Sequence, residues 1–263
     1  MKCVVVKLGG HALDSLAPSS NVLVDLAHDV AQLREQGVDV VVVHGGGPQI
    51  AGLLNLVGLE SKFQDGLRIT DAETMPFVAM ALGDVNVHIV AALNHAGLAS
   101  VGLCGADAGL LRSKSVGEPF DRVGEAPSVN RAALDALWSA GFTPVVNPVA
   151  LDENGEELNC NADAVAGALA GELSADVLVL LSDVDQLLAD VADPSSAMVS
   201  VTGAEIEAMK RSGAARDGMN PKLTAALDAL HGGAARILLA NGIRAHALRD
   251  ALNRSIPTTE VLR

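Results

Sequence analysis

The sequence contains no tyrosine, and aromatic residues make up only 2% of its 263 positions. Hydrophobic residues nevertheless make up 49% of the chain, so its interior must consist mainly of Ala, Val and Leu side chains. That composition suits helices layered on a sheet better than an aromatic-rich β-sandwich. A chain of this length forms one large α/β domain or two fused lobes.

Basic residues are scarce, because 18 Lys and Arg face 32 Asp and Glu and leave a formal net charge of -14. This balance argues against nucleic acid or an anionic membrane as the main partner, since both attract basic surfaces. No apolar run reaches the roughly 18 residues of a membrane-spanning helix. The apolar stretch in residues 1–7 is too short for a signal peptide.

Cysteine is also rare, with Cys3, Cys104 and Cys160 scattered along the chain. They form no CxxC pair and no even set, which argues against a structural zinc site and against disulfides. We therefore expect a cytoplasmic protein that has no metal site of its own.

Short runs rich in β-branched residues alternate with helical patterns along the chain. Strands are predicted at residues 4–6, 38–43, 99–103, 143–147, 177–181 and 237–239. Most of these runs are apolar throughout, as in a parallel sheet covered by helices on both faces. Helices are predicted over 22–33 and 132–138, and β-hairpins over 59–70 and 110–126. This order predicts an α/β fold with a mostly parallel sheet, in which lobes 1–175 and 176–263 share that sheet.

Glycine turns follow two of the predicted strands, as Lys7-Leu8-Gly9-Gly10 and His44-Gly45-Gly46-Gly47-Pro48. Such turns bring backbone N–H groups close to an anion, and a following helix adds positive potential. Ligands of open parallel sheets collect at these strand ends. No GxxxxGK[ST] motif is present, and Ile50 stands where a dinucleotide-binding motif has its third glycine. We therefore expect a polyanion site of another kind.

Three charged residues have ambiguous local environments. Lys7 ends an apolar strand, where it either extends along the surface to water or meets an anion. Lys222 precedes an amphipathic run and could simply be a residue of the helix start. Asp163 or Asn161 could merely cap the alanine-rich helix that follows.

Seven segments together resemble the acetylglutamate kinases of the amino-acid kinase superfamily, in order and over nearly the whole chain. Besides the two glycine turns, the matching segments are 66–74, 101–103, 159–163, 181–184 and 217–222. The resemblance implies the three-layer αβα fold of this superfamily, with small β-hairpins over the substrate site. It also implies transfer of the ATP γ-phosphoryl group to the side-chain carboxylate of N-acetyl-L-glutamate, in arginine biosynthesis. Mg²⁺ would be held mainly by the nucleotide phosphates.

The resemblance assigns roles residue by residue. The catalytic residues would be Lys7 and Lys222, which neutralise the transferring phosphoryl group, and Asp163, which holds both lysines. Substrate would be bound by Gly46, Gly47, Arg68 and Asn159, of which Arg68 and Asn159 grip the α-carboxylate. Nucleotide would be bound by Gly9, Gly10, Ser182, Asp183 and Val184, in the lobe 176–263, while 1–175 would bind the amino-acid substrate.

Two segments depart from the pattern of these kinases. Val87 replaces a common lysine outside the phosphoryl-binding pair, and Asp185-Gln186 replaces a stretch that usually contains glycine. The chain also begins two residues before its first strand, whereas arginine-inhibited relatives carry an extra N-terminal helix that links dimers into hexamers. We therefore expect a homodimer that is insensitive to arginine.

Other functions remain open at this stage. A kinase for carrier-protein-linked α-aminoadipate or glutamate is the nearest alternative, although such enzymes favour Thr-x-Gly-Asp where this chain has 159–163. A non-catalytic regulatory paralogue would usually have lost one of the catalytic charges. A nicotinamide-dependent dehydrogenase would rest on the α/β pattern alone, which does not define a function.

Overall fold

A large central sheet organises the protein. The structure, a computed structural model, describes residues 1–9, 13, 20–64, 66–190, 192–212 and 219–262. Within these residues, eight strands form one sheet in the order β15-β17-β16-β12-β1-β2-β9-β5. Their bounds are β1 (Cys3–Leu8), β2 (Asp39–His44), β5 (Ser100–Cys104), β9 (Thr143–Asn147), β12 (Val177–Ser182), β15 (Ser200–Thr202), β16 (Ile237–Asn241) and β17 (Thr258–Leu262). Each pairing is parallel except that of β16 with β17, so the predicted strands and their direction are confirmed.

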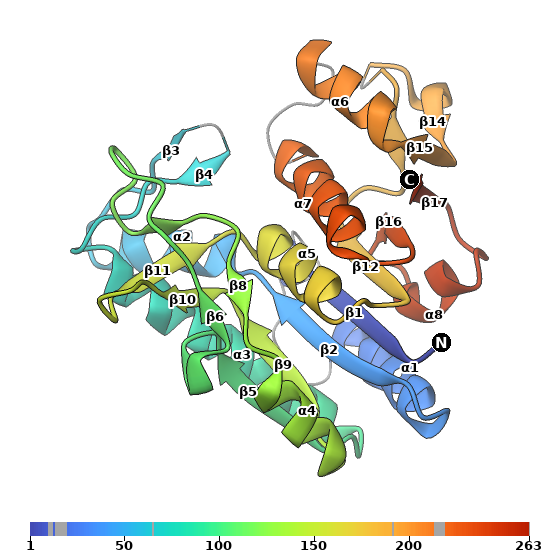
Figure 1. Ribbon diagram of the computed structural model, residues 1–263, viewed down its shortest axis with the longest axis horizontal. Coiled ribbons are helices and arrows are strands. Elements are labelled where there is room, and N and C mark those ends of the chain that lie inside the picture. Colours follow the sequence, from blue (N-terminus) through green and yellow to red (C-terminus); the bar gives the residue numbers. More distant parts are fainter. Residues whose placement is uncertain (10–12, 14–19, 65, 191, 213–218, 263) are drawn as a thin grey trace.

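Helices cover both faces of this sheet, as the apolar strands require. The helices are α1 (Asn21–Glu35), α2 (Gly47–Leu56), α3 (Met75–His95), α4 (Ala132–Ser139), α5 (Ala162–Glu172), α6 (Gly203–Ser212), α7 (Met219–Gly232) and α8 (Ala247–Leu252). Val5 and Val41 belong to the core shared with α4, α5, α6 and α7, whereas Val4 and Val42 belong to the core shared with α1, α3 and α8. Figure 1 shows α5 and α7 side by side on one face. The expected three-layer αβα fold is confirmed.

Smaller sheets lie beside the central one. A sheet in the order β7-β11-β10-β6-β8 consists of β6 (Leu111–Arg112), β7 (Val123–Gly124), β8 (Ser128–Val129), β10 (Val149–Leu151) and β11 (Glu157–Cys160). Two further strand pairs are β3 (Phe63–Gln64) with β4 (Leu67–Arg68), and β13 (Leu187–Leu188) with β14 (Ala197–Met198). Short 3₁₀ helices, Asp107–Gly109 and Pro194–Ser196, complete the described elements.

Both predicted hairpins are found. The hairpin over 59–70 is confirmed, because β3 and β4 pair antiparallel. In the one predicted over 110–126, β6 pairs antiparallel with β8 and an antiparallel bridge joins Ser115 to Gly124, so the chain reverses as predicted, although the second arm extends to Val129. The short strands of this segment also pair with distant ones, β6 with β10 and β7 with β11, and local spacing did not indicate those partners.

Helix α3 corrects the statement that no segment is apolar enough to span a membrane. Met75–His95 has 21 residues and contains an 18-residue window with a mean hydropathy of 1.6, and it is the one helix of the described chain with that length and composition. Its inner side packs on the sheet through residues such as Val85 and Ile89, which are fully buried. Asn86 on the same side donates hydrogen bonds to His44 and to a carbonyl of β9. These contacts are those of a core helix.

Candidate active site

Lys7 and Asp163 form a buried ion pair at the carboxyl end of the central strands. Lys7 is the penultimate residue of β1, and its Nζ lies 2.8 Å from Oδ1 of Asp163. Neither side chain is more than 7% exposed. Of the two possibilities for Lys7, the structure therefore favours a lysine that meets an anion over one that extends to water.

Asp163 holds a second lysine as well. Lys222, in the first turn of α7, donates a hydrogen bond of 3.1 Å to Oδ2 of Asp163. The capping role at α5 belongs to Asn161, whose side chain accepts from the backbone N–H of Asp163 at 2.8 Å. The carboxylate of Asp163 is thus left for the two lysines, as the resemblance implied.

Small residues bring α5 and α7 close enough for this contact. A Cβ on Gly167 would lie 2.6 Å from the carbonyl oxygen of Ala225, and one on Gly171 would lie 3.1 Å from Cα of Gly232. The two helix backbones therefore nearly touch, as they do where glycine removes the side chain from an interface. This close packing places the start of α7 beside the start of α5.

The three charges strongly perturb one another. Burial raises the pKa of Asp163, but the charges of Lys7 and Lys222 outweigh it and hold that pKa below its ordinary value. Burial lowers the pKa of Lys7, and repulsion from Lys222 adds to this, against the opposing attraction of Asp163. Two ammonium groups around one carboxylate leave a net positive charge facing the cleft.

Glycine turns line the same cleft. Gly9 follows β1, and a Cβ there would lie only 2.2 Å from Nζ of Lys7. Gly46 is the N-cap of α2, and Pro48 occupies the first turn of that helix as predicted. The N–H groups at such a helix start have no carbonyl partner within the helix and favour an anion. Gly10 lies outside the described residues.

Arg68 and Asn159 both line the cleft and are linked to each other through Thr70. The Arg68 guanidinium, at the end of β4, donates to the carbonyl oxygen of Gly47 at 2.9 Å and to Ser61 Oγ, and lies 4.6 Å from the ring centre of Phe63. Asn159 of β11 donates to Thr70 Oγ1 at 3.0 Å, and that hydroxyl donates to the backbone oxygen of Arg68 at 3.0 Å. Thr70 therefore links the two predicted carboxylate-binding residues.

One cleft of about 280 Å³ collects most of the predicted residues. Its lining includes Lys7, Gly9, Gly46, Gly47, Arg68, Asn159 and Asp163. Lys222 reaches it through Asp163. Sequence reasoning missed Ser61 and Thr70 as partners of the site, although Thr70 lies inside a matched segment.

The predicted nucleotide residues at 182–184 lie at the same edge of the sheet but do not line this cleft. Ser182 ends β12, the strand beside β1, and the N–H of Gly9 donates to the neighbouring Leu181 oxygen at 3.2 Å. Ser182 is buried, whereas Val184 is partly exposed. Ser182 therefore follows the residue that Gly9 contacts, and none of the three residues lines the cleft that contains Arg68.

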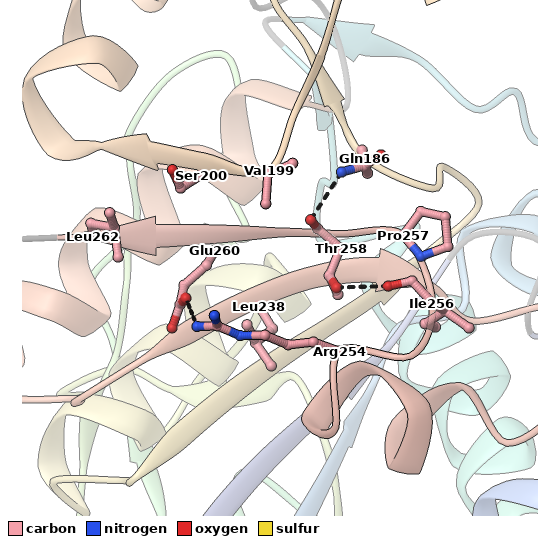
Figure 2. A pocket seen from close by; sticks show the side chains of 10 residues that line it. All are labelled: Gln186, Val199, Ser200, Leu238, Arg254, Ile256, Pro257, Thr258, Glu260 and Leu262. Atoms are coloured by element: carbon pink, nitrogen blue, oxygen red, sulfur yellow. Dashed lines mark hydrogen bonds and ion pairs between the residues drawn. The ribbon is translucent and has the colours of Figure 1, made fainter.

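A larger hollow of about 420 Å³ lies elsewhere, against β15, β16 and β17. Figure 2 shows Arg254 paired with Glu260 and Gln186 donating to the Thr258 oxygen along its wall. Glu260 is also held by Arg236 at 2.7 Å. The lining of this hollow contains neither a glycine turn nor the lysines that mark the cleft at Lys7. Among the described residues, no group of three or more His, Cys, Asp or Glu is placed to hold a metal ion.

Fold and site together are those of an amino-acid kinase, and sequence comparison agrees. The profile of the amino acid kinase family matches residues 2–241, and the chain belongs to this family. Acetylglutamate kinases are among its relatives. That of Symbiobacterium thermophilum is 40% identical over 257 residues, with 94% of this chain and 86% of the relative covered. That of Methanocaldococcus jannaschii is 39% identical, with 94% and 85% covered.

Solved structures agree on the fold. The protein smu.665 from Streptococcus mutans UA159 superposes with a TM-score of 0.81 at 24% identity, covering 91% of this chain and 94% of its own. At that identity the likeness concerns the fold alone. The resemblance inferred from the seven segments is confirmed by the family match and by the relatives.

Proposed function

We propose that this kinase transfers the γ-phosphoryl group of ATP to the side-chain carboxylate of N-acetyl-L-glutamate, a reaction of arginine biosynthesis. The observation that carries the proposal is the pair of lysines held by Asp163 beside two glycine turns, in a chain about 40% identical to acetylglutamate kinases. The product is an acyl phosphate. A carboxylate oxygen forms a bond to phosphorus while the bond to the β,γ-bridging oxygen breaks, and ADP leaves.

The residues of the cleft address the main difficulty of this reaction, which is bringing one anion against another. The nucleophile is already ionised, so no general base is needed, and catalysis rests on positioning and charge neutralisation. Lys7 neutralises the transferring group from the substrate side and Lys222 from the nucleotide side. Asp163 keeps both ammonium groups in place. The backbone N–H of Gly46, which lines the cleft, adds a donor that needs no rearrangement during the reaction.

Arg68 and Asn159 would bind the α-carboxylate of the substrate. A guanidinium forms paired hydrogen bonds with a carboxylate, and Arg68 already points into the cleft from β4. Asn159 donates a hydrogen bond to Thr70, which links it to Arg68. The amino-acid substrate would then bind to the lobe 1–175.

The nucleotide would lie over the lobe 176–263, with Gly9, Ser182, Asp183 and Val184 near its phosphates and base. Mg²⁺ enters with ATP as part of the nucleotide substrate, which fits a site whose one central carboxylate, Asp163, already holds two lysines. We expect the enzyme to act in the cytoplasm.

The quaternary structure we propose is a homodimer formed through α3. The outer side of this helix exposes Met80 and Val87, whose side chains are 54% and 65% accessible, in a helix of high mean hydropathy. A second copy of the helix would cover this apolar side, whereas isolated exposed apolar residues need no partner.

The reaction is tested by trapping the acyl phosphate with hydroxylamine in the presence of ATP and Mg²⁺. N-acetyl-L-glutamate should give the hydroxamate, and free glutamate and N-acetylaminoadipate should give far less. A preference for an aminoadipate compound, free or carrier-linked, would instead support the alternative kinase. No transfer to any of these acceptors, with nucleotide still bound, would support a regulatory paralogue.

A further inference from the structure

A buried histidine lies directly behind the second glycine turn. His44 ends β2, is fully buried, and its Nδ1 lies 2.9 Å from the carbonyl oxygen of Gly45. Its Nε2 lies 3.0 Å from Nδ2 of Asn86, an amide on α3 that is only 7% exposed. Two buried polar side chains thus stand one behind the other against the turn that faces the cleft.

The carbonyl oxygens at the two ends of this chain of contacts determine which nitrogen atoms in it carry hydrogen and donate. Asn86 Nδ2 lies 3.0 Å from the oxygen of Val145, which only accepts, so this atom is the amide nitrogen and it donates. Its second hydrogen points to Nε2 of His44, which must therefore accept. His44 is then the neutral tautomer with hydrogen on Nδ1, and it donates to the Gly45 oxygen. Burial agrees, because it lowers the pKa of His44 to about 4.

The hydrogen bond to the Gly45 oxygen determines where the next N–H points. The oxygen of Gly45 and the N–H of Gly46 belong to one planar trans peptide, in which they point in opposite directions. The oxygen is held toward His44, behind the turn, so the N–H of Gly46 is directed away from it, and Gly46 lines the cleft. We propose that His44 and Asn86 are positioning residues, which aim the Gly46 N–H at the group transferred in the cleft. This inference rests on the proposed kinase reaction.

Neighbouring residues pack closely around this pair. A Cβ on Gly102, in β5, would lie 1.9 Å from Oδ1 of Asn86. A Cβ on Gly46 would lie 3.1 Å from Leu82 and 3.4 Å from Val85, both on α3. Helix α3 therefore supports the turn through apolar contacts and through the polar relay from Asn86. Gly102, in the matched segment 101–103, has no side chain and so leaves the space that the Asn86 amide occupies.

Two substitutions of His44 separate positioning from packing. His44→Asn keeps an N–H donor at the same number of bonds from Cβ as Nδ1, whereas His44→Gln places its amide where Nε2 was and loses the donor to Gly45. Both replace the imidazole by a neutral amide, so both should lower thermal stability similarly. We expect His44→Gln to lower kcat by about 10- to 100-fold, less than the roughly 10²–10³ for removing an oxyanion donor. His44→Asn should retain most of kcat, and His95→Gln, at an exposed histidine, serves as the control.

A loss in kcat with little change in KM distinguishes a positioning role of His44 from a structural one. The KM values for both substrates should change by less than about threefold, because the lost interaction is made in the transition state. Equal kcat losses in His44→Asn and His44→Gln, or none in either, would overturn the proposal. An inactive wild-type enzyme would overturn the proposed kinase reaction instead.

A measurement on the unmodified protein covers the case in which neither variant folds. ¹⁵N NMR of histidine-labelled protein near pH 7 should show His44 with a protonated Nδ1 and a bare Nε2. A proton on Nε2 would mean that Nδ1 cannot donate to Gly45, and the proposal would fail whatever the activity. Where the variants fold, uniformly ¹⁵N-labelled protein gives a second readout, because the Gly46 amide resonance should shift in His44→Gln and less in His44→Asn.

Discussion

The ammonium of Lys7 lies 2.8 Å from Oδ1 of Asp163, and Lys222 occupies the other oxygen of the same carboxylate at 3.1 Å. One carboxylate therefore fixes two cations that come from β1 and α7, more than 200 residues apart in sequence by their numbers. Burying two like charges around one carboxylate is unfavourable for folding. The arrangement therefore points to a ligand that uses both cations. A triphosphate is the kind of ligand that would use both.

Removing either lysine should impair the reaction more than substrate binding. We predict that Lys7→Ala and Lys222→Ala each lower kcat by about 10² or more, as for the loss of one transition-state donor, with smaller changes in KM. Lys2→Ala, at the exposed start of the chain before β1, is the matched control. Steady-state kinetics with unchanged kcat in both cleft variants would defeat the assignment.

Gly9 should be required for activity rather than for folding. A methyl group there would overlap Nζ of Lys7, but that ammonium ends a flexible side chain and can swing away. We therefore predict that Gly9→Ala lowers kcat by about 10-fold or more while Tm stays within a few degrees. Gly52→Ala, where an added Cβ meets nothing within 4 Å, should keep kcat and gain up to about 1 kcal/mol of helix stability. Equal kcat in the two variants would contradict this reading of Gly9.

Arg68 should determine affinity for the amino-acid substrate. Lysine cannot reproduce a two-point guanidinium contact, so Arg68→Lys loses about one charged hydrogen bond, worth roughly 1.5–3 kcal/mol. We predict a KM for N-acetyl-L-glutamate raised by about 10-fold or more, with KM for ATP nearly unchanged. Arg131→Lys, in an exposed helical ion pair with Asp135, controls for the substitution itself. A larger rise in the KM for ATP than in the KM for N-acetyl-L-glutamate would mean that Arg68 contacts the nucleotide instead of the amino-acid substrate.

The sequence indicates the central sheet well because its strands are buried on both faces. The hydrophobic composition of runs such as 177–181 and 143–147 reflects that burial, so the predicted strands nearly match the observed ones. The strands around 110–126 are two residues long and pair with distant segments, and no local pattern encodes those partners. For the site, the motifs place Lys7, Asp163 and Arg68 in one cleft as implied. The hydrogen bond between Asn86 and His44 is not evident from the sequence, because it joins residues 42 positions apart.

The exposed side of α3 should control association. We predict that the wild type is a dimer by light scattering and that Val87→Glu shifts it toward the monomer, because a buried unpaired carboxylate is costly at an apolar contact. Val199→Glu changes an apolar residue that is 75% exposed on the C-terminal lobe, and it should leave the mass unchanged. A monomeric wild type, or a dimer unaffected at Val87, would place the contact elsewhere.

His44 should make the fold sensitive to acid before the carboxylates do. Its pKa is lowered from 6.5 to about 4 by burial, with the hydrogen bond to Gly45 opposing this. Between these values the unfolded chain binds a proton that the folded chain does not, so stability falls as the pH is lowered. The full stabilisation is present above about pH 6.5 and is lost as the pH approaches 4.

Urea unfolding at pH 7 and pH 5 measures this contribution. Linkage to His44 alone should cost about 2 kcal/mol between these two pH values. His44→Asn has no group that titrates in this range at that position, so its loss of stability on acidification should be smaller by about that amount. Other groups, including Asp163 with its lowered pKa, are the same in both proteins and cancel in the comparison. Identical pH dependence in the two proteins would mean that the His44 imidazole takes up its proton while folded.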